Sequence, residues 1–142
     1  VRPTELREEI GYWRKANQIH GWFVEHVKAG EDDFRDVYVE RDQLRELRRT
    51  ANEVLAASKL IPGTVPRGWT LDRFGRKNHV EDGMVIANSE VAEALLPVRQ
   101  GCFFGSTSYD EEYLDILYDT LAILDAALDS PAGMEFVYRS SW

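Results

Sequence analysis

The sequence predicts an α+β fold in which three main helices pack on a small, mostly antiparallel sheet. Three long stretches carry apolar residues at alternating three- and four-residue spacing, which is the helical period. Short runs rich in β-forming residues lie between them, bounded by glycine and proline. The chain has 142 residues with no internal repeat and no long linker, so residues 1–142 are expected to form a single domain.

The first helix is expected from Thr4, as its N-cap, to Ala29, with Gly30 ending it. His20 projects from the centre of its apolar face and Asn17 from near one edge. Gly21 lies inside this helix, where a close neighbour would explain a residue that weakens helices. The apolar face consists of Leu6, Ile10, Trp13, Ala16, Phe23, Val24 and Val27.

A short strand, Asp36–Val39, precedes the second helix, which is expected over Arg41–Ser58. One stripe of this helix is apolar and the rest is densely charged, as in a helix docked on the surface of a core. The stripe consists of Leu44, Leu47, Ala51, Val54, Leu55 and Ser58.

Helical periodicity disappears from Pro62 to Asn88, where glycine and proline mark turns. Within this stretch, Arg73–Asn78 is expected to be a hairpin tip and Gly83–Asn88 a short strand. Ser89 then caps a brief helix that Pro97 ends.

The last third begins with an apolar strand, Gly101–Ser106. Ser108 and Glu111 have the spacing of a capping box and open the third main helix, which carries a leucine stripe. That helix ends near Asp129, and alternation predicts a final strand over Glu135–Arg139. The two strands are the expected pairing partners.

Composition restricts the classes of function. The net charge of −8 argues against broad nucleic-acid binding, although it leaves room for a local basic site. The single cysteine, Cys102, excludes an internal disulfide and favours a reducing, cytoplasmic setting. No apolar run approaches the roughly 20 residues that cross a bilayer, so no membrane association is expected. We also expect no cofactor.

The first candidate site is the set Trp13, Asn17 and His20, which share one side of the expected helix. Buried amide and imidazole groups need hydrogen-bond partners. We favour a structural network that ties the helix to the sheet. The alternative is a pocket in which these groups meet a ligand.

The second candidate is the turn from Gly105 to Ser108, where hydroxyls and free N–H groups at a helix N-terminus suit an anion. An ordinary helix cap is the favoured interpretation, and no phosphate-loop motif is present. Phe103 or Phe104 is expected to bury itself against the Trp13–Phe23 face and bring the turn near His20. The full candidate ligand set is Trp13, Arg14, Lys15, Asn17, His20, Ser106, Thr107 and Ser108.

The third candidate is a protein-binding surface on the third main helix. Residues 100–138 contain eight acids and no Lys or Arg. Two isoleucines lie off the leucine stripe, so a partner surface and a merely solvated face are weighed nearly evenly. The proposed partner surface consists of Glu112, Asp115, Ile116, Asp119 and Ile123.

The fourth candidate is a basic and aromatic stretch, "RGWTLDRFGRK" at residues 67–77, a composition that can hold phosphates and stack bases. A solvent-facing hairpin is the favoured interpretation. No metal site is expected, because His20 and His26 point to different sides of one helix and His79 stands alone. Cys102 could pair with His20 as a nucleophile, but its apolar strand favours an inert buried thiol.

Three blocks together resemble a known family: "EIGYWRKANQIHGWF" at residues 9–23, "GCFFGSTSYDEEYLDILYDTL" at residues 101–121, and the terminal "SSW". The chain is similar to small proteins encoded in bacteriophage and prophage genomes. The likeness spans nearly the whole chain and is weakest in the middle. The family has no assigned activity, so the resemblance implies a phage-related origin and no catalytic residues.

These observations favour a non-enzymatic, phage-type binding protein that engages a host or phage protein through its acidic helix face. The alternative is a protein that binds a nucleotide or another small anion, or an enzyme, with its site around His20 and the Gly105–Ser108 turn. The oligomeric state and the reaction, if any, are not indicated by the sequence.

Overall fold

The computed structural model describes residues 8–33, 35–99 and 108–140. It confirms the α+β class, with four helices in these ranges, and it divides the strands between two separate antiparallel pairs. The elements in chain order are α1 (Asn17–His26), β1 (Val37–Val39), α2 (Arg41–Ala57), β2 (Leu60–Asp72), β3 (Gly75–Ile86), α3 (Glu90–Leu95), α4 (Glu111–Leu128) and β4 (Phe136–Tyr138).

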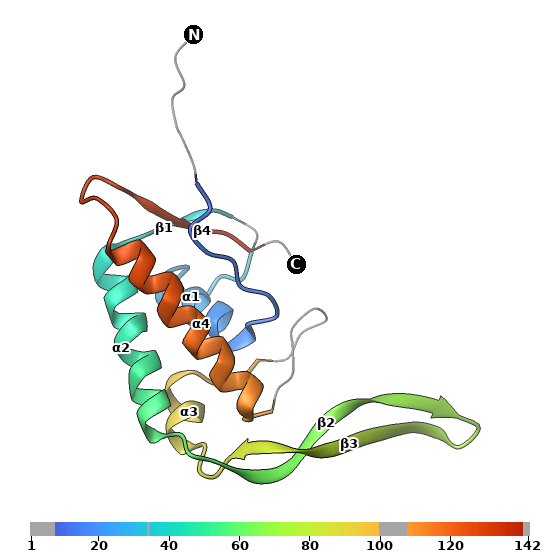
Figure 1. Ribbon diagram of the computed structural model, residues 1–142. Coiled ribbons are helices and arrows are strands. Elements are labelled where there is room, and N and C mark those ends of the chain that lie inside the picture. The colour runs from blue at the N-terminus through green and yellow to red at the C-terminus, as the bar shows by residue number, and fades with distance from the viewer. Residues whose placement is uncertain (1–7, 34, 100–107, 141–142) are drawn as a thin grey trace.

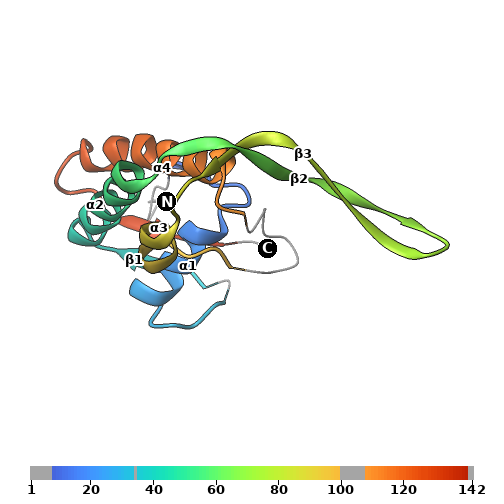
Figure 2. The same ribbon diagram turned by 90° about the horizontal axis from the view of Figure 1, so that it is seen from below.

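Helices α2 and α4 lie side by side, with the β1–β4 pair at one end and the β2–β3 pair leaving from the other (Figures 1 and 2). Helix α1 packs its apolar residues on the same core, as do α3 and β4. The predicted stripes of the two long helices account for most of their buried residues. The fully buried apolar residues include Ile19, Phe23, Leu47, Val54, Leu96, Leu117 and Leu124.

The first helix is much shorter than predicted. It begins at Asn17 instead of Thr4, and the described residues before it run without helical structure. Lys15 has a φ of 54°, a conformation that breaks a right-handed helix. The segment lies against α4, because a Cβ on Gly11 would be 2.3 Å from Ile123 Cγ2. The expected N-cap, Thr4, lies outside the described residues.

The C-terminal end of α1 agrees better with the prediction. The helix ends at His26, and Gly30 has a φ of 84° and donates its N–H to the carbonyl of Val24 at 2.7 Å. The C-cap of the helix is Val27, so Gly30 closes the turn after α1 and does not cap the helix as predicted.

The predicted strands at Asp36–Val39 and Glu135–Arg139 are confirmed as β1 and β4. They pair with each other, with Val37 opposite Tyr138 and Val39 opposite Phe136. The strand predicted at Gly101–Ser106 lies outside the described residues, so its pairing with Glu135–Arg139 stays a prediction. The pairing of β1 with β4 joins segments almost 100 residues apart, which local patterns cannot reveal.

The region from Pro62 to Asn88 differs most from the prediction. It is one long β-hairpin, β2–β3, and not a series of turns with a single short strand. The predicted tip is correct, since the strands turn at Arg73 and Phe74. The two prolines and the glycines of β2 fit a two-stranded ribbon with two open edges, because neither strand must donate every N–H to a neighbour.

The cap of α4 is also corrected. The helix begins at Glu111, and the carboxylate of Asp110, not Ser108, accepts the backbone N–H of Tyr113 at 3.1 Å. Helix α2 carries the capping box that the sequence analysis placed on α4: Glu40 and Gln43 satisfy each other's backbone N–H groups. The brief helix after Ser89 is confirmed as α3.

Candidate functional site

His20 is the centre of a buried polar cluster. Its side chain is 1% exposed, and its two ring nitrogens face the Tyr138 hydroxyl at 2.6 Å and an Asp32 carboxylate oxygen at 2.8 Å. An imidazole with both nitrogens engaged in this way has no free nitrogen to offer a ligand. The cluster therefore supports the structural interpretation of His20, in which β4 and the loop after α1 supply its partners.

Tyr138 links this cluster to the aromatic core. Its ring stacks on Phe23 with the centroids 4.0 Å apart and an angle of 4° between the planes. Burial raises the pKa of the Tyr138 phenol above its ordinary value, and the nearby Asp32 carboxylate adds to this shift. The phenol therefore stays protonated and can donate to His20 across the neutral pH range.

Lys28 continues the same cluster, although it was not among the predicted site residues. Its side chain is fully buried, and its ammonium donates to the Asp33 carbonyl at 2.6 Å and lies 5.8 Å from the centroid of the Tyr138 ring. The backbone N–H of Arg35 hydrogen-bonds the Asp33 carboxylate and lowers its pKa. The loop after α1 is thus held by buried polar contacts from both sides.

Asn17 hydrogen-bonds a different part of the chain. Its side-chain oxygen accepts the backbone N–H of Arg99 at 2.8 Å. The Arg99 side chain lies against Gly21, where a Cβ would be 2.4 Å from Arg99 Cδ, which explains the glycine within α1. Nη1 of Arg99 is buried and has no hydrogen-bond partner among the residues that the structure describes. No pattern in the sequence marks Arg99 as a partner of α1.

Trp13 is close to the cluster although it precedes the helix. Its indole N–H donates to Thr120 Oγ1 at 2.9 Å, and its ring lies 5.8 Å from the ring of Phe23 and 6.4 Å from that of Tyr138. Trp13 and His20 therefore share Tyr138 as a neighbour, as their predicted proximity suggested. The predicted ligand residues Arg14 and Lys15 are exposed to solvent.

The Gly105–Ser108 turn can be placed only in part. Ser108 is half-buried in a bend before α4, whereas Ser106 and Thr107 lie outside the described residues. The expected approach of Phe103 or Phe104 to Trp13 and the nucleophile pair with Cys102 also fall outside them. In the described part of the chain, no group of three or more His, Cys, Asp or Glu side chains could hold a metal ion.

The acidic surface on α4 is present but its apolar component differs from the prediction. Glu112, Asp115 and Asp119 are exposed, and no described cation forms an ion pair with any of them. Ile116 is half-buried against the core and Ile123 is half-buried beneath Gly11, so neither is the exposed isoleucine that the helical projection indicated. The N-terminal segment, which was predicted to be helical, covers Ile123.

The exposed aromatic residue of the acidic surface is Tyr118, which is 59% exposed. It lies one turn from Asp115 and from Ala122 on the outward side of α4. The sequence signal was available, because Tyr118 falls outside the leucine stripe. It was overlooked in favour of the two isoleucines.

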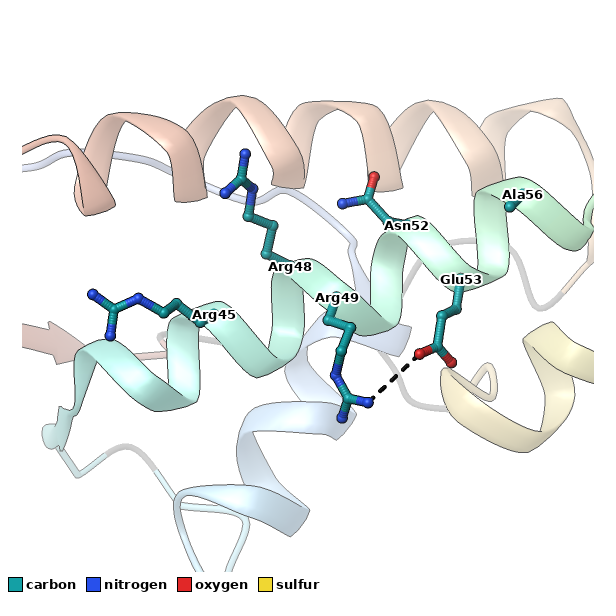
Figure 3. Close-up of a pocket in the computed structure, with 6 residues that line it drawn as sticks. All are labelled: Arg45, Arg48, Arg49, Asn52, Glu53 and Ala56. Carbon is teal, nitrogen blue, oxygen red and sulfur yellow. Dashed lines mark ion pairs between the residues drawn. The ribbon is translucent and has the colours of Figure 1, made fainter.

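A shallow groove runs along the outer face of α2 (Figure 3). Each of its arginines has a carboxylate partner: Arg45 pairs with Asp42 at 2.6 Å, Arg48 with Asp125 at 2.9 Å, and Arg49 with Glu53 at 3.6 Å. The charges are neutralised in place, so the groove has little attraction left for an anion. Its lining residues are Arg45, Arg48, Arg49, Asn52, Glu53 and Ala56.

The basic and aromatic stretch lies on the β2–β3 hairpin, far from the buried cluster (Figure 1). Every residue from Pro66 to Asn78 is exposed. Arginine side chains cover one side of each aromatic ring, with Arg76 4.7 Å from the centroid of Trp69 and Arg73 4.9 Å from that of Phe74. The predicted solvent-facing hairpin is therefore correct, and it is much longer than expected.

Comparisons with known proteins add no relative. No protein-family model, curated protein or solved structure matches this chain. Among the described residues, none of the helices combines the length and apolarity that crossing a membrane requires.

Proposed function

We propose that the chain is a non-enzymatic binding protein of phage or prophage type, acting in the cytoplasm of the bacterial host, and that the acidic face of α4 engages a protein partner. The supporting observation is the row of exposed carboxylates at Glu112, Asp115 and Asp119, which form no ion pair with a cation in the described part of the chain. Like charges three or four residues apart destabilise a helix by about 0.2–0.5 kcal/mol per pair. A basic partner surface would remove this repulsion.

The surroundings of the row support a partner over a solvated face. The last turn of α4 contains no basic residue, so nothing on the helix offsets its charge. Tyr118 adds an exposed aromatic side chain, a residue type enriched at protein interfaces. The complementary surface is therefore basic with a pocket for a tyrosine.

The experiment is capture of host proteins by the immobilised chain at low and at high salt. The double variant Asp115→Lys/Asp119→Lys should lose the captured partner, and parent capture should weaken as salt rises. The control Glu25→Lys/Glu46→Lys changes the net charge equally at exposed acids of α1 and α2, and it should capture as the parent does. Equal capture by both double variants would end the proposal.

The small-anion alternative keeps one supporting observation, the buried and unpartnered Nη1 of Arg99 beside Gly21. An unsatisfied buried polar group costs about 1–3 kcal/mol, so a bound acceptor there would be favourable. Its site would be formed by Arg99 and Asn17 and not by His20, because both ring nitrogens of His20 already have partners. Native mass spectrometry of the purified protein tests it: a bound small molecule that is absent from Arg99→Met supports this alternative.

A further inference from the structure

The β2–β3 hairpin extends away from the rest of the chain as a two-stranded ribbon, here named the arm (Figures 1 and 2). At about 3.3 Å per residue, its 13-residue strand β2 spans roughly 40 Å. An isolated two-stranded ribbon is only marginally stable in water. The outer part of this ribbon has both faces in solvent and is therefore expected to gain stability from a bound partner.

The outer part of the arm, residues 66–80, is here named the arm tip, and it carries a charge opposite to that of the rest of the chain. It holds four cations and one carboxylate, Asp72, and hence a charge of +3. Because the whole chain carries −8, the remaining residues carry −11. The cations are Arg67, Arg73, Arg76 and Lys77.

The arm tip is distant from most of the chain's acids, so its positive charge can attract an anionic ligand. Charges are screened over about 8 Å at physiological ionic strength, and Lys77 lies roughly 13 Å along β3 from Glu81, the first acid after the arm tip. A polyanion at the arm tip would therefore experience the local positive charge and little of the repulsion from α4. The net charge of the whole chain does not describe this region.

The register places cations on both faces of the ribbon. Leu71 lies opposite Arg76 on one face, and Thr70 lies opposite Lys77 on the other. The side-chain contacts agree, since Arg76 Nε donates to Asn78 Oδ1 at 3.1 Å on its own face. A ribbon with cations on both faces is suited to a site bounded by phosphates on two sides.

An aromatic residue is exposed at the turn itself. Phe74 is 84% exposed, more than any other exposed large hydrophobic residue of the described chain, and it is flanked by Arg73 and Arg76. In the major groove of DNA, an apolar side chain such as phenylalanine can contact the methyl group of thymine. The exposed phenyl ring of Phe74, at the end of a basic ribbon, is placed to make such a contact with a base.

We propose that the arm tip is a binding element for double-stranded DNA that enters a groove between two phosphate backbones, with Arg73, Arg76 and Lys77 contacting phosphates and Phe74 contacting the bases. The major groove, about 12 Å wide, admits a two-stranded β-ribbon. Single-stranded nucleic acid would contact one face of the ribbon, and the cations on the other face would have no phosphate to bind. This inference is independent of the protein partner proposed for α4.

The test measures fluorescence anisotropy of a labelled duplex of about 20 base pairs as the full chain is added, from about 50 mM salt upward. The triple variant Arg73→Gln/Arg76→Gln/Lys77→Gln should bind at least tenfold more weakly. If its three cations each neutralise one phosphate, the slope of log K against log salt should become less steep by about 2.7. Phe74→Ala should weaken binding without changing the slope.

The control Arg45→Gln/Arg49→Gln/Lys59→Gln removes the same charge from exposed positions outside the arm, and it should keep the parent slope. Three results would overturn the proposal: a parent chain that fails to bind the duplex at low salt, an arm-tip variant that binds as the parent does, or tighter binding of a single strand of equal length. Loss of a self-associated state in the arm-tip variant, with DNA binding unchanged, would also overturn it and assign the arm to a second copy of the chain.

Discussion

Removal of the His20 imidazole tests whether the buried cluster holds the fold together. His20→Ala leaves the Tyr138 hydroxyl without the nitrogen that lies 2.6 Å away, at a site where His20 is 1% exposed. Truncation of a large buried side chain costs about 2–4 kcal/mol, and a buried hydroxyl that loses its partner costs about 1–3 kcal/mol. Because Asp32 is half-exposed and can turn to water, it adds little.

The expected loss for His20→Ala is therefore about 3–7 kcal/mol in the free energy of unfolding. Tyr138→Phe keeps the stack on Phe23 and removes only the hydroxyl, so it should cost about 1–2 kcal/mol. If the two residues act through their shared hydrogen bond, the double variant should be more stable than the sum of the single losses predicts, by about 0.5–2 kcal/mol.

The assay is urea unfolding followed by circular dichroism, with the midpoint compared at unchanged slope. His26→Ala is the matched control, because His26 lies on the same helix and is exposed, and it should cost less than about 1 kcal/mol. A His20→Ala variant within about 1 kcal/mol of the parent would refute the reasoning, as would strict additivity with Tyr138→Phe.

Two further predictions follow from packing and burial. Gly11→Val should detach the N-terminal segment from α4, because a Cβ at this position would overlap Ile123, and hydrogen exchange should then increase around Trp13. Alkaline titration should lower stability as pH rises above 10.0, the ordinary tyrosine value, because burial raises the pKa of Tyr113 and Tyr138 and the unfolded chain releases their protons first. Tyr113→Phe should reduce this alkaline loss; unchanged alkaline stability loss in that variant would contradict the assignment.

The sequence by itself determined the elements whose cause is local. Helices α2 and α4 follow from uninterrupted three- and four-residue spacing, and the hairpin tip follows from the residues at its turn. The basic and aromatic composition of the arm tip and the acids of α4 were visible for the same reason. These properties depend on neighbours within one or two turns of chain.

Tertiary structure alone decided the features that depend on distant residues. Residues 9–16 have a helical pattern, but Gly11 and Trp13 pack on α4 instead, and this contact covers Ile123 of the predicted partner surface. The partners of His20 come from positions 12 and 118 residues away. No periodicity encodes such separations, because the loop after α1 brings Asp32 to His20 and the packing of β4 on the core brings Tyr138.

The arm is a second element whose structure the local sequence pattern did not determine. Its glycines and prolines were interpreted as turns, because residue type cannot distinguish a turn from a twisted ribbon whose edges both face water. Cross-strand pairing over 12 register positions turned these residues into one extended element. The sequence therefore determined the basic and aromatic side chains of the arm tip, and the tertiary structure decided the distance of the tip from the acidic body.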